Sequence, residues 1–449
     1  MTHIRKWLAL LMCLFLLPVT ALAESQRLPL QDAHRVTLTQ LGEQQRNGSE
    51  VYRWDIVTAQ ENVTQELNAL TKAWADELAP TLGRAANTGD SRLDVNILHS
   101  RTGLNWMSFM VQSRYVLNKE TKDVRFTTRT YDMATGQRLI LTDIFPADSE
   151  AWALLERAVE EGVSTYYPDL APNAEALASV CLRESIEQMD FTLHGMSLVL
   201  HLHAGDFYPG KQHLIKITLF YPDIRGYMTE KAQQETDNLR YYDTVALTYD
   251  DGPNGWVTRE ILNVLLENGV RATFFPVGDR MRGHARYILR EHDESHAIAT
   301  HNYSHVYAHQ VGRDELLKLK ERADKVHLEL LGIVPRYARA PGGIWKPMAS
   351  AQVGWPLIQW SSQGMDMEEP PRAPRLVSDL VIGTADNGDV ILMHDMKQPS
   401  IEASALFIPR LQERGFLFLT IDELFAKDGV ELQPDTAYWC CVDGVTTDE

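Results

Sequence analysis

The stretch TVALTYDDGP, residues 244–253, decides how the second half of the chain is interpreted. Its first six residues are mostly β-branched, aromatic or apolar, which predicts a short buried strand. The strand ends in two adjacent acids, Asp250 and Asp251. Neighbouring carboxylates at a buried strand end repel each other and lose hydration, so they need a cation or a proton. The stretch therefore predicts both a strand and the beginning of a site.

Strand-like and helix-like patterns alternate after this stretch. Val257, Ile261 and Leu265 share one face of a predicted helix that ends at Gly269. Further buried strands are predicted at 272–277, 296–300, 337–340, 357–360, 389–393 and 416–421, with amphipathic helical stretches such as 315–331 and 403–414 between them. This order is typical of an α/β fold, a parallel sheet or barrel with helices outside. In such folds the chemistry lies at the carboxyl ends of the strands.

Polar residues follow several of the predicted strands at these ends. His301 and His305 come after the third strand, and their spacing places two imidazoles on one side of a helical turn, within reach of one metal ion. Arg339, Asp366 and His394 follow later strands. Each signal alone is common in proteins that have no site there. Because a barrel brings consecutive strand ends together, the sequence predicts that these residues converge.

Taken in order, these motifs resemble those of the polysaccharide deacetylases, also called the NodB-homology family or carbohydrate esterase family 4. The resemblance covers roughly residues 243–425. It rests on Thr248-Tyr249-Asp250-Asp251-Gly252-Pro253, on His301 to His305, on Arg339-x-Pro341, on Trp360-Ser361 followed by Asp366, and on Leu392-x-His394-Asp395. It implies a distorted (β/α) barrel that removes the acetyl group of an N-acetylated sugar by metal-assisted hydrolysis.

The resemblance implies a role for each motif residue. Asp251, His301 and His305 would bind the metal, for which the family favours zinc, while cobalt, nickel or iron also suits two histidines and one carboxylate. Asp250 would be the general base for the attacking water. Arg339 would keep Asp250 ionised and oriented through a charge-assisted hydrogen bond.

The remaining implied roles concern the leaving group and the acetyl group. His394 would protonate the leaving amine, and Asp366 would hold His394 and raise its pKa. The backbone N–H of Gly342 would act with the metal to stabilise the developing oxyanion. Leu392 would form a wall against the acetyl methyl group.

Four positions depart from the family pattern. Asn302 stands where Ser or Thr is common, and Gly342 replaces an aromatic residue that forms one wall of the substrate groove. Gln363 replaces an acid that often opens the fourth motif, and Met367 replaces a Trp. None of the catalytic positions is missing, so we expect the mechanism to be retained, while the choice of sugar stays open.

Residues 24–222 are predicted to form an α+β domain in front of the barrel. The patterns found there are helices over 63–78 and 149–164, a hairpin of strands near 124–127 and 139–141, and a strand over 198–203. The motifs Gly136 to Phe145 and Asp206 to Gly210, with Phe191 between them, are similar to extracellular domains of the anti-sigma factor RsiV and the peptidoglycan deacetylase PdaC. That similarity implies a cell-envelope protein whose front domain binds a glycan or a lysozyme-like protein.

The predicted organisation also includes the two ends of the chain and a linker between the two domains. Arg5 and Lys6 precede an apolar run and a small-residue site, so residues 1–23 are predicted to be a secretory signal peptide, with an uncleaved membrane anchor as the alternative. A polar linker is predicted at 223–242, the deacetylase domain at 243–428 and a C-terminal tail at 429–449. We expect a chain beginning near residue 236 to fold and act on small substrates by itself.

Charge restricts the partners. The formal net charge is −18, and cleavage before residue 24 would remove Arg5 and Lys6 and make it −20. A surface this acidic argues against nucleic acid as a partner. With no further stretch long enough to span a bilayer, we expect a secreted, periplasmic or cell-wall protein that meets a glycan substrate such as peptidoglycan or chitin oligomers.

Two questions stay open at the level of sequence. The same residues would serve an O-acetyl esterase acting on xylan, and an inactive barrel would leave an envelope sensor whose front domain is the functional part. Cys181 could pair with Cys440 or Cys441, or the two neighbours could form a vicinal bridge.

Overall fold

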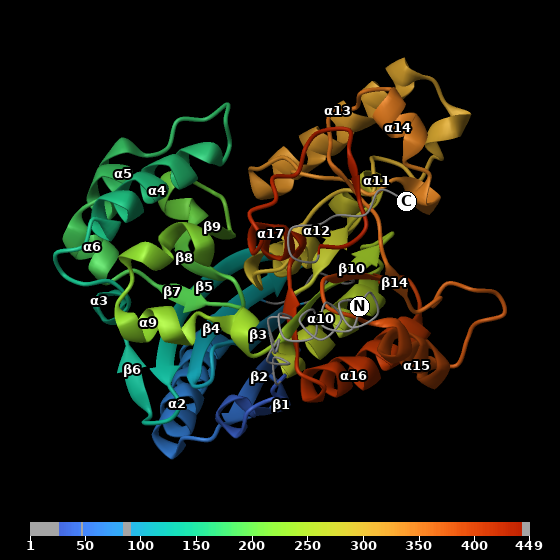
Figure 1. Ribbon diagram of the computed structural model, residues 1–449. Coiled ribbons are helices and arrows are strands. Elements are labelled where there is room, and N and C mark those ends of the chain that lie inside the picture. The colour runs from blue at the N-terminus through green and yellow to red at the C-terminus, as the bar shows by residue number, and fades with distance from the viewer. Residues whose placement is uncertain (1–26, 46–47, 84–90, 442–449) are drawn as a thin grey trace, which may run out of the picture.

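The computed structural model describes residues 27–45, 48–83 and 91–441 (Figure 1). The predicted signal peptide at 1–23 lies outside these residues. Within the described ranges, no helix combines the length and the apolar character that crossing a bilayer requires.

A parallel sheet forms the centre of the C-terminal part, residues 243–441. Its middle strand is β10 (Asp243–Asp250), of which all residues but the first are buried, as expected for a strand that is covered on both faces. The other strands are β11 (Thr273–Phe275), β12 (Ala297–Ile298), β14 (Ser362–Gln363), β15 (Asp389–His394) and β16 (Phe416–Leu419). β10 pairs with β15 on one side and with β11 and β16 on the other. The predicted α/β character is therefore confirmed for this part.

Beyond β12 the sheet continues through single bridges. Thr300 pairs with Ala338, and Ala338 pairs with Leu357. The strands predicted at 296–300 and 337–340 are thus reduced to short contacts, because the chain turns away after one or two paired residues.

The predicted C-terminal tail is wrong for the residues up to 441. β17 (Ala437–Tyr438) pairs in parallel with β13 (Leu357–Ile358), and both Tyr438 and Cys441 are buried. This strand was not predicted because it is only two residues long and lies in a mostly polar segment. Cys440 and Cys441 form no disulfide with each other or with Cys181.

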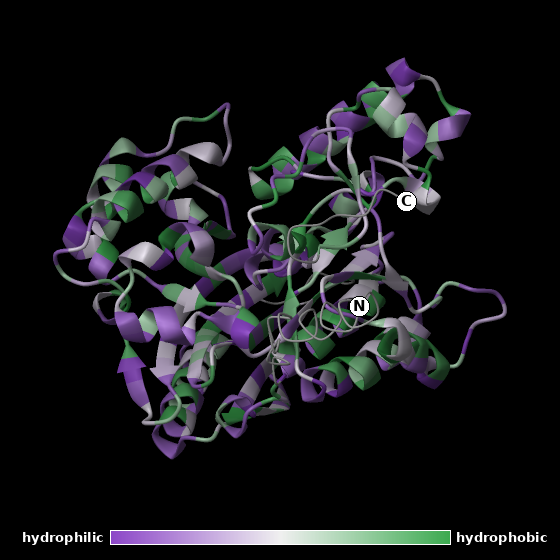
Figure 2. Cartoon of the chain, viewed as in Figure 1, coloured by the Kyte–Doolittle hydropathy of each residue, from purple (hydrophilic) through white to green (hydrophobic). Residues whose placement is uncertain are grey.

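Helices cover the sheet of the C-terminal part. They are α10 (Gly255–Asn268), α11 (Gly278–Met281), α12 (Ala285–Asp293), α13 (Arg313–Leu331), α14 (Lys346–Ser350), α15 (Pro374–Thr384), α16 (Gln398–Glu413) and α17 (Ile421–Ala426). Apolar residues of α10, α15 and α16 join those of β10 and β15 in one buried cluster. Figure 2 shows hydrophilic and hydrophobic residues alternating along the outer helices, the pattern of helices that bury one face.

The N-terminal part, residues 27–242, begins with a sheet in the strand order β1 to β6. The strands are β1 (Thr37–Gln44), β2 (Glu50–Val57), β3 (Ser91–Thr102), β4 (Trp106–Leu117), β5 (Glu120–Asp132) and β6 (Gln137–Leu139). Helix α2 (Glu61–Leu78) buries Val63 and Leu67 against it, which confirms the helix predicted at 63–78. The predicted return strand at 139–141 is shifted, because Leu141 already begins the short helix α3 (Leu141–Ile144).

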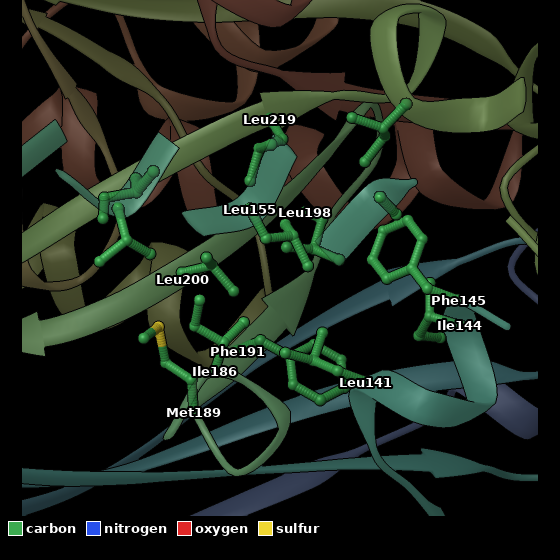
Figure 3. Packing of buried hydrophobic residues seen from close by; sticks show 14 of the residues in the cluster. Leu141, Ile144, Phe145, Leu155, Ile186, Met189, Phe191, Leu198, Leu200 and Leu219 are labelled. Atoms are coloured by element: carbon green, nitrogen blue, oxygen red, sulfur yellow. The ribbon is translucent and has the colours of Figure 1, made fainter. Parts of the chain in front are cut away.

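A second layer of the N-terminal part packs around a large apolar core (Figure 3). A three-stranded antiparallel sheet lies on one side, made of β7 (Phe191–Leu193), β8 (Ser197–His203) and β9 (Leu214–Phe220). The helices of this layer are α4 (Ala151–Thr165), α5 (Ala174–Val180), α6 (Arg183–Glu187) and α7 (Ala204–Phe207). α4 and β8 confirm the helix and the strand predicted at 149–164 and 198–203.

The segment 223–242, predicted to be a linker, is instead folded and packed. It contains the end of α8 (Tyr221–Ile224) and all of α9 (Glu230–Glu235), and Tyr242 is buried. The amide of Asn238 donates to Thr102 Oγ1 at 2.7 Å and to the carbonyl of Gly195 at 2.6 Å. A few buried residues inside a polar stretch were enough to make it part of the core, and composition alone did not reveal them.

Buried polar contacts join the two parts. Arg114 of β4 pairs with Asp293 at the end of α12 at 2.5 Å, and the side chains of both are almost fully buried. Glu423 of α17 accepts from Ser197 Oγ at 2.7 Å and pairs with Arg271 at 2.5 Å. Such buried contacts are typical of one continuous structure, since interfaces between loosely tethered domains are smaller and wetter.

Candidate active site

Three potential metal ligands meet at the carboxyl edge of the parallel sheet. Asp251 Oδ1 lies 3.5 Å from His301 Nε2 and 3.3 Å from His305 Nε2. The three ligand atoms all lie within 4.8 Å of one another. Asp251 follows β10 directly with a positive φ of 74°, and this sharp turn sends its carboxylate towards the histidines.

The protonation pattern shows that this group fits a divalent cation. His301 Nδ1 lies 2.9 Å from the backbone oxygen of Arg339, which can only accept, so Nδ1 carries the proton and Nε2 presents a lone pair. Burial lowers the pKa of His301 to about 3, which keeps the ring neutral. Asp251 Oδ1 is buried without a hydrogen-bond partner among the described residues. The lone pair of His301 Nε2 and the carboxylate oxygen of Asp251 therefore face each other with no proton between them. This arrangement leaves a place for a metal ion.

A second cluster of such residues in the described chain does not need a metal. In the cluster of His213, His292 and Asp293, the ring nitrogens of His213 contact the hydroxyl of Tyr167 at 2.6 Å and a backbone carbonyl at 2.9 Å. Asp293 contacts His292 Nδ1 at 3.1 Å and is paired with Arg114. These groups satisfy one another, so the cluster is explained as a hydrogen-bonded network between the two parts.

Asp250 is the second acid of the site and is held by a buried arginine. Arg339 Nη1 donates to Asp250 Oδ1 at 2.8 Å and to Thr248 Oγ1 at 2.8 Å. Its other nitrogens donate to the backbone oxygens of Ile358 and Gln359 at 3.0 and 2.9 Å, which fixes the guanidinium plane. Burial raises the pKa of Asp250, and the charge of Arg339 opposes that rise. The carboxylate is thus oriented and more basic than an ordinary aspartate.

His394 stands at the end of the neighbouring strand with its own acid. Its Nδ1 lies 2.9 Å from Asp366 Oδ1, and its backbone N–H donates to Asp366 Oδ2 at 2.9 Å. Ser400 Oγ donates to the same carboxylate at 2.6 Å. Burial works against a charged His394, but the carboxylates of Asp366, Asp250 and Asp251 together outweigh it and raise the pKa of the imidazole. The pair is suited to hold a proton near neutral pH.

Strand register brings Asp250 and His394 together. β10 and β15 run in parallel with Asp250 opposite His394 and Thr248 opposite Leu392. The convergence that the sequence predicted at the strand ends is therefore present, and it follows from the pairing of two strands that are far apart in the chain.

Leu392 and Gly342 lie at the edges of this group. Leu392 lines a cavity of about 300 Å³ together with Asp366, His394 and Met367. Gly342 has a positive φ of 66°, and a Cβ placed there would lie 2.6 Å from the ring of Tyr307. The Tyr307 ring packs against His305 with centroids 5.6 Å apart. An aromatic ring from the loop that carries His305 thus lies over Gly342.

Some supporting residues escaped the sequence analysis. Arg280 donates to the backbone oxygen of Asp251, and Ser400 to Asp366, but neither lies in a recognisable motif. Asp395, which stood in a quoted motif without an assigned role, accepts from Thr258 Oγ1. A Cβ at Gly252 would lie 2.1 Å from the Asp395 carboxylate, which explains why glycine follows the two acids.

The carboxyl edge of this parallel sheet carries an aspartate held by an arginine, a histidine held by an aspartate and a group of potential metal ligands, an arrangement suited to hydrolytic chemistry. Residues 240–353 match the polysaccharide deacetylase family. Peptidoglycan-N-acetylglucosamine deacetylase PgdA of Listeria monocytogenes is 26% identical over 330 residues, covering 71% of this chain and 69% of that protein. A chitooligosaccharide deacetylase of a Bradyrhizobium species is 31% identical over 194 residues, covering 38% of this chain and 86% of that protein.

Among solved structures, a family 4 acetyl xylan esterase from Clostridium thermocellum in complex with a cobalt ion is 28% identical, with a TM-score of 0.41 over 44% of this chain and 98% of that one. The relatives' coverage and identity establish the assignment: the chain belongs to the polysaccharide deacetylase family. It is accordingly a hydrolase of the class that acts on amide bonds.

Proposed function

We propose that this protein is an exported, metal-dependent deacetylase that hydrolyses the acetamide of N-acetylated amino sugars in peptidoglycan or chitin-like oligomers. The observation that supports the proposal is the register of β10 and β15, which sets Asp250 opposite His394, next to a group of potential metal ligands. The names of the relatives agree with amino sugars as substrates.

Two residues of this chain move the protons in the proposed reaction. Asp250 accepts a proton from the attacking water, and Arg339 keeps it aimed at that water. His394 gives a proton to the nitrogen of the leaving amine as the C–N bond breaks, and Asp366 fixes the ring that delivers it. Acetate and a free amino sugar result, so one water molecule is consumed for each acetyl group released.

The remaining residues bind and position. Asp251, His301 and His305 would hold a divalent ion, zinc being favoured and cobalt, nickel or iron being alternatives, and such an ion supplies Lewis acidity at the acetyl carbonyl. The backbone N–H of Gly342 would donate to the same oxygen as it gains negative charge. Leu392 would bound the acetyl methyl group in the cavity next to His394.

The metal can be tested by removing it. We expect one divalent ion per chain in elemental analysis, loss of turnover on treatment with a chelator and recovery on adding the metal back, because two imidazoles and one carboxylate converge within 4.8 Å of one another. Zinc, cobalt, nickel and iron should be compared in the recovery step. Full activity in a preparation that contains no stoichiometric metal would contradict this prediction.

Release of acetate from purified peptidoglycan, chitin pentamer and acetylated xylan, measured side by side, tests the substrate. We expect release from the two amino-sugar polymers and little from xylan. An Asp250→Asn variant serves as the inactive control for contaminating activity. Release from acetylated xylan alone would make the protein an O-acetyl esterase, and binding without release from any polymer would make it an envelope sensor.

Tyr307 is expected to form part of the sugar-binding surface. Its side chain is about one third exposed and lies over Gly342, where the family pattern places an aromatic residue. Tyr307→Ala should raise KM for chitin pentamer by about two- to tenfold, the loss expected for one aromatic contact, with a smaller change in kcat. Tyr307→Phe is the matched control, because it keeps the ring. An unchanged KM in the alanine variant would show that the substrate does not touch this ring.

The proposal extends to the architecture and the location. We infer that the parallel sheet and the bridges through Thr300, Ala338 and Leu357 form the distorted (β/α) barrel of the family over residues 243–441, with the N-terminal part as an α+β domain packed against it. Export to the periplasm, the cell wall or the medium is supported by the sequence of residues 1–23. A glycan or a lysozyme-like protein as a partner of the N-terminal part remains a prediction.

A further inference from the structure

A cavity of about 120 Å³ lies between the two parts of the protein, away from the site described above. Strands β2, β3 and β4 form one wall, and helices α10 and α12 form the other. Five arginines line it: Arg92, Arg114, Arg259, Arg286 and Arg290. The acidic residues of the lining are Glu50 and Asp94, and three acids outside the lining, Glu260, Asp293 and Glu294, pair with arginines of the wall.

Three of these arginines use the same edge of their guanidinium group for an acidic partner. Arg92 is bound to Asp94, Arg259 to Glu260 and Arg290 to Glu294, in each case through Nε and Nη2. The third nitrogen, Nη1, makes no hydrogen bond to a described residue in any of the three. The acids therefore fix the direction of the side chains and leave one donor edge of each available.

Arg114 lines the cavity and has donors from which no described residue accepts. Its side chain is 2% exposed, and Nη2 pairs with Asp293. Its Nε and Nη1 are buried and have no hydrogen-bond partner among the described residues. Buried donors are nearly always paired in native structures, because an unmade hydrogen bond leaves the cost of dehydration uncompensated.

We propose that this cavity is a binding site for a phosphate group. Guanidinium groups reach the cavity from β3, β4, α10 and α12, and a tetrahedral oxyanion with several acceptor oxygens can bind donors from different directions, which a single planar carboxylate does less well. The volume is several times the roughly 10–15 Å³ that a single water needs, so a small polyatomic anion fits. The phosphate is either a free ion or one carried by a phosphorylated glycan.

The position of the site gives it a function for the N-terminal part. Because the walls come from both parts, a bound phosphate joins them, and α10 begins five residues after Asp250. The N-terminal part would thereby tether a phosphorylated polymer beside the catalytic strand end. The site itself does not depend on which sugar the enzyme deacetylates.

Calorimetric titration and thermal unfolding of the full-length protein test the proposal. The probes are inorganic phosphate, N-acetylglucosamine 6-phosphate and unphosphorylated N-acetylglucosamine, all at one ionic strength set with chloride. We expect saturable binding of a phosphate-containing probe with one site per chain and a matching rise in Tm. Tighter binding of the sugar phosphate than of inorganic phosphate assigns the site to a phosphorylated glycan, and the reverse order assigns it to the free ion.

Variants locate the site. Arg92→Gln and Arg259→Gln change partly exposed side chains, and each should weaken phosphate binding about tenfold or more, the loss expected for one charge-assisted contact. Arg282→Gln is the matched control, because Arg282 is exposed, paired with Glu329 and outside the cavity. Three results would overturn the proposal and leave a cavity that holds only water. They are the absence of saturable binding, a Tm with phosphate that is no higher than the Tm with chloride alone, and equal affinity in all three variants and the original protein.

Discussion

Replacing Asp250 by asparagine is expected to reduce turnover by about 10²- to 10⁴-fold while the metal stays bound. The amide keeps the size of the side chain and its contact with Arg339 but cannot accept the proton of the attacking water. Asp251→Asn should lower both turnover and metal affinity, because it removes the charged member of the ligand group. Steady-state kinetics and elemental analysis of both variants measure the two effects separately.

A suitable control for this pair is Glu329→Gln. Glu329 forms an exposed ion pair with Arg282 and does not line the cavity beside His394, so its loss should leave metal content and kcat nearly unchanged. Equal loss of metal in the Asp250 and Asp251 variants would contradict the division of roles between the two acids.

Removing the N-terminal part is expected to destroy the stable fold of what remains. The polar composition of 223–242 suggested that a chain beginning near residue 236 folds alone, but the structure reverses that expectation. Such a chain would lose Arg114 and Ser197, the buried partners of Asp293 and Glu423. We expect aggregation or a large fall in Tm, measured by circular dichroism and thermal unfolding. Cooperative unfolding at the Tm of the full chain, with unchanged kcat, would show that the two parts are independent.

A single substitution tests the same interface without truncation. Asp293→Asn in the full chain leaves Arg114 buried beside a neutral partner, and breaking a buried ion pair in this way lowers the free energy of unfolding by about 3–5 kcal/mol. Asp379→Asn is the control, because its pair with Arg410 is exposed on both sides and is worth about 1 kcal/mol or less. Denaturant unfolding of both variants gives the comparison.

Much of the C-terminal part could be predicted because its signals are local. The run that ends at Asp250 is apolar on both faces, which identifies a central strand, and Gly269 ends α10 in the left-handed conformation as its place in the sequence indicates. The motif residues were found because each lies at or shortly after the end of a strand or of a bridged residue. The short strands β12 and β13 were overestimated, since two paired residues leave little periodicity to separate them from the loops around them.

Contacts between distant residues explain what could not be predicted. The ring of Tyr307 lies over Gly342 only because the two loops pack together, and the Asp395 carboxylate fits only because Gly252 has no side chain. Neither relation has a fixed spacing in the sequence, so no pattern search would detect it.

The sequence by itself determined the family, the order of strand and helix in the C-terminal part, and the identity of the residues at the strand ends. These features depend on side-chain type and on spacing along a few neighbouring residues. The tertiary structure decided that 223–242 and the residues up to 441 belong to the fold, that the two parts share a buried interface, and that five arginines surround one cavity. Arg114 and Asp293 are 179 residues apart in the chain. Their pairing depends on how the separate elements pack, and the free energy of that packing depends on residues far apart in the chain, so no local stretch of sequence predicts it.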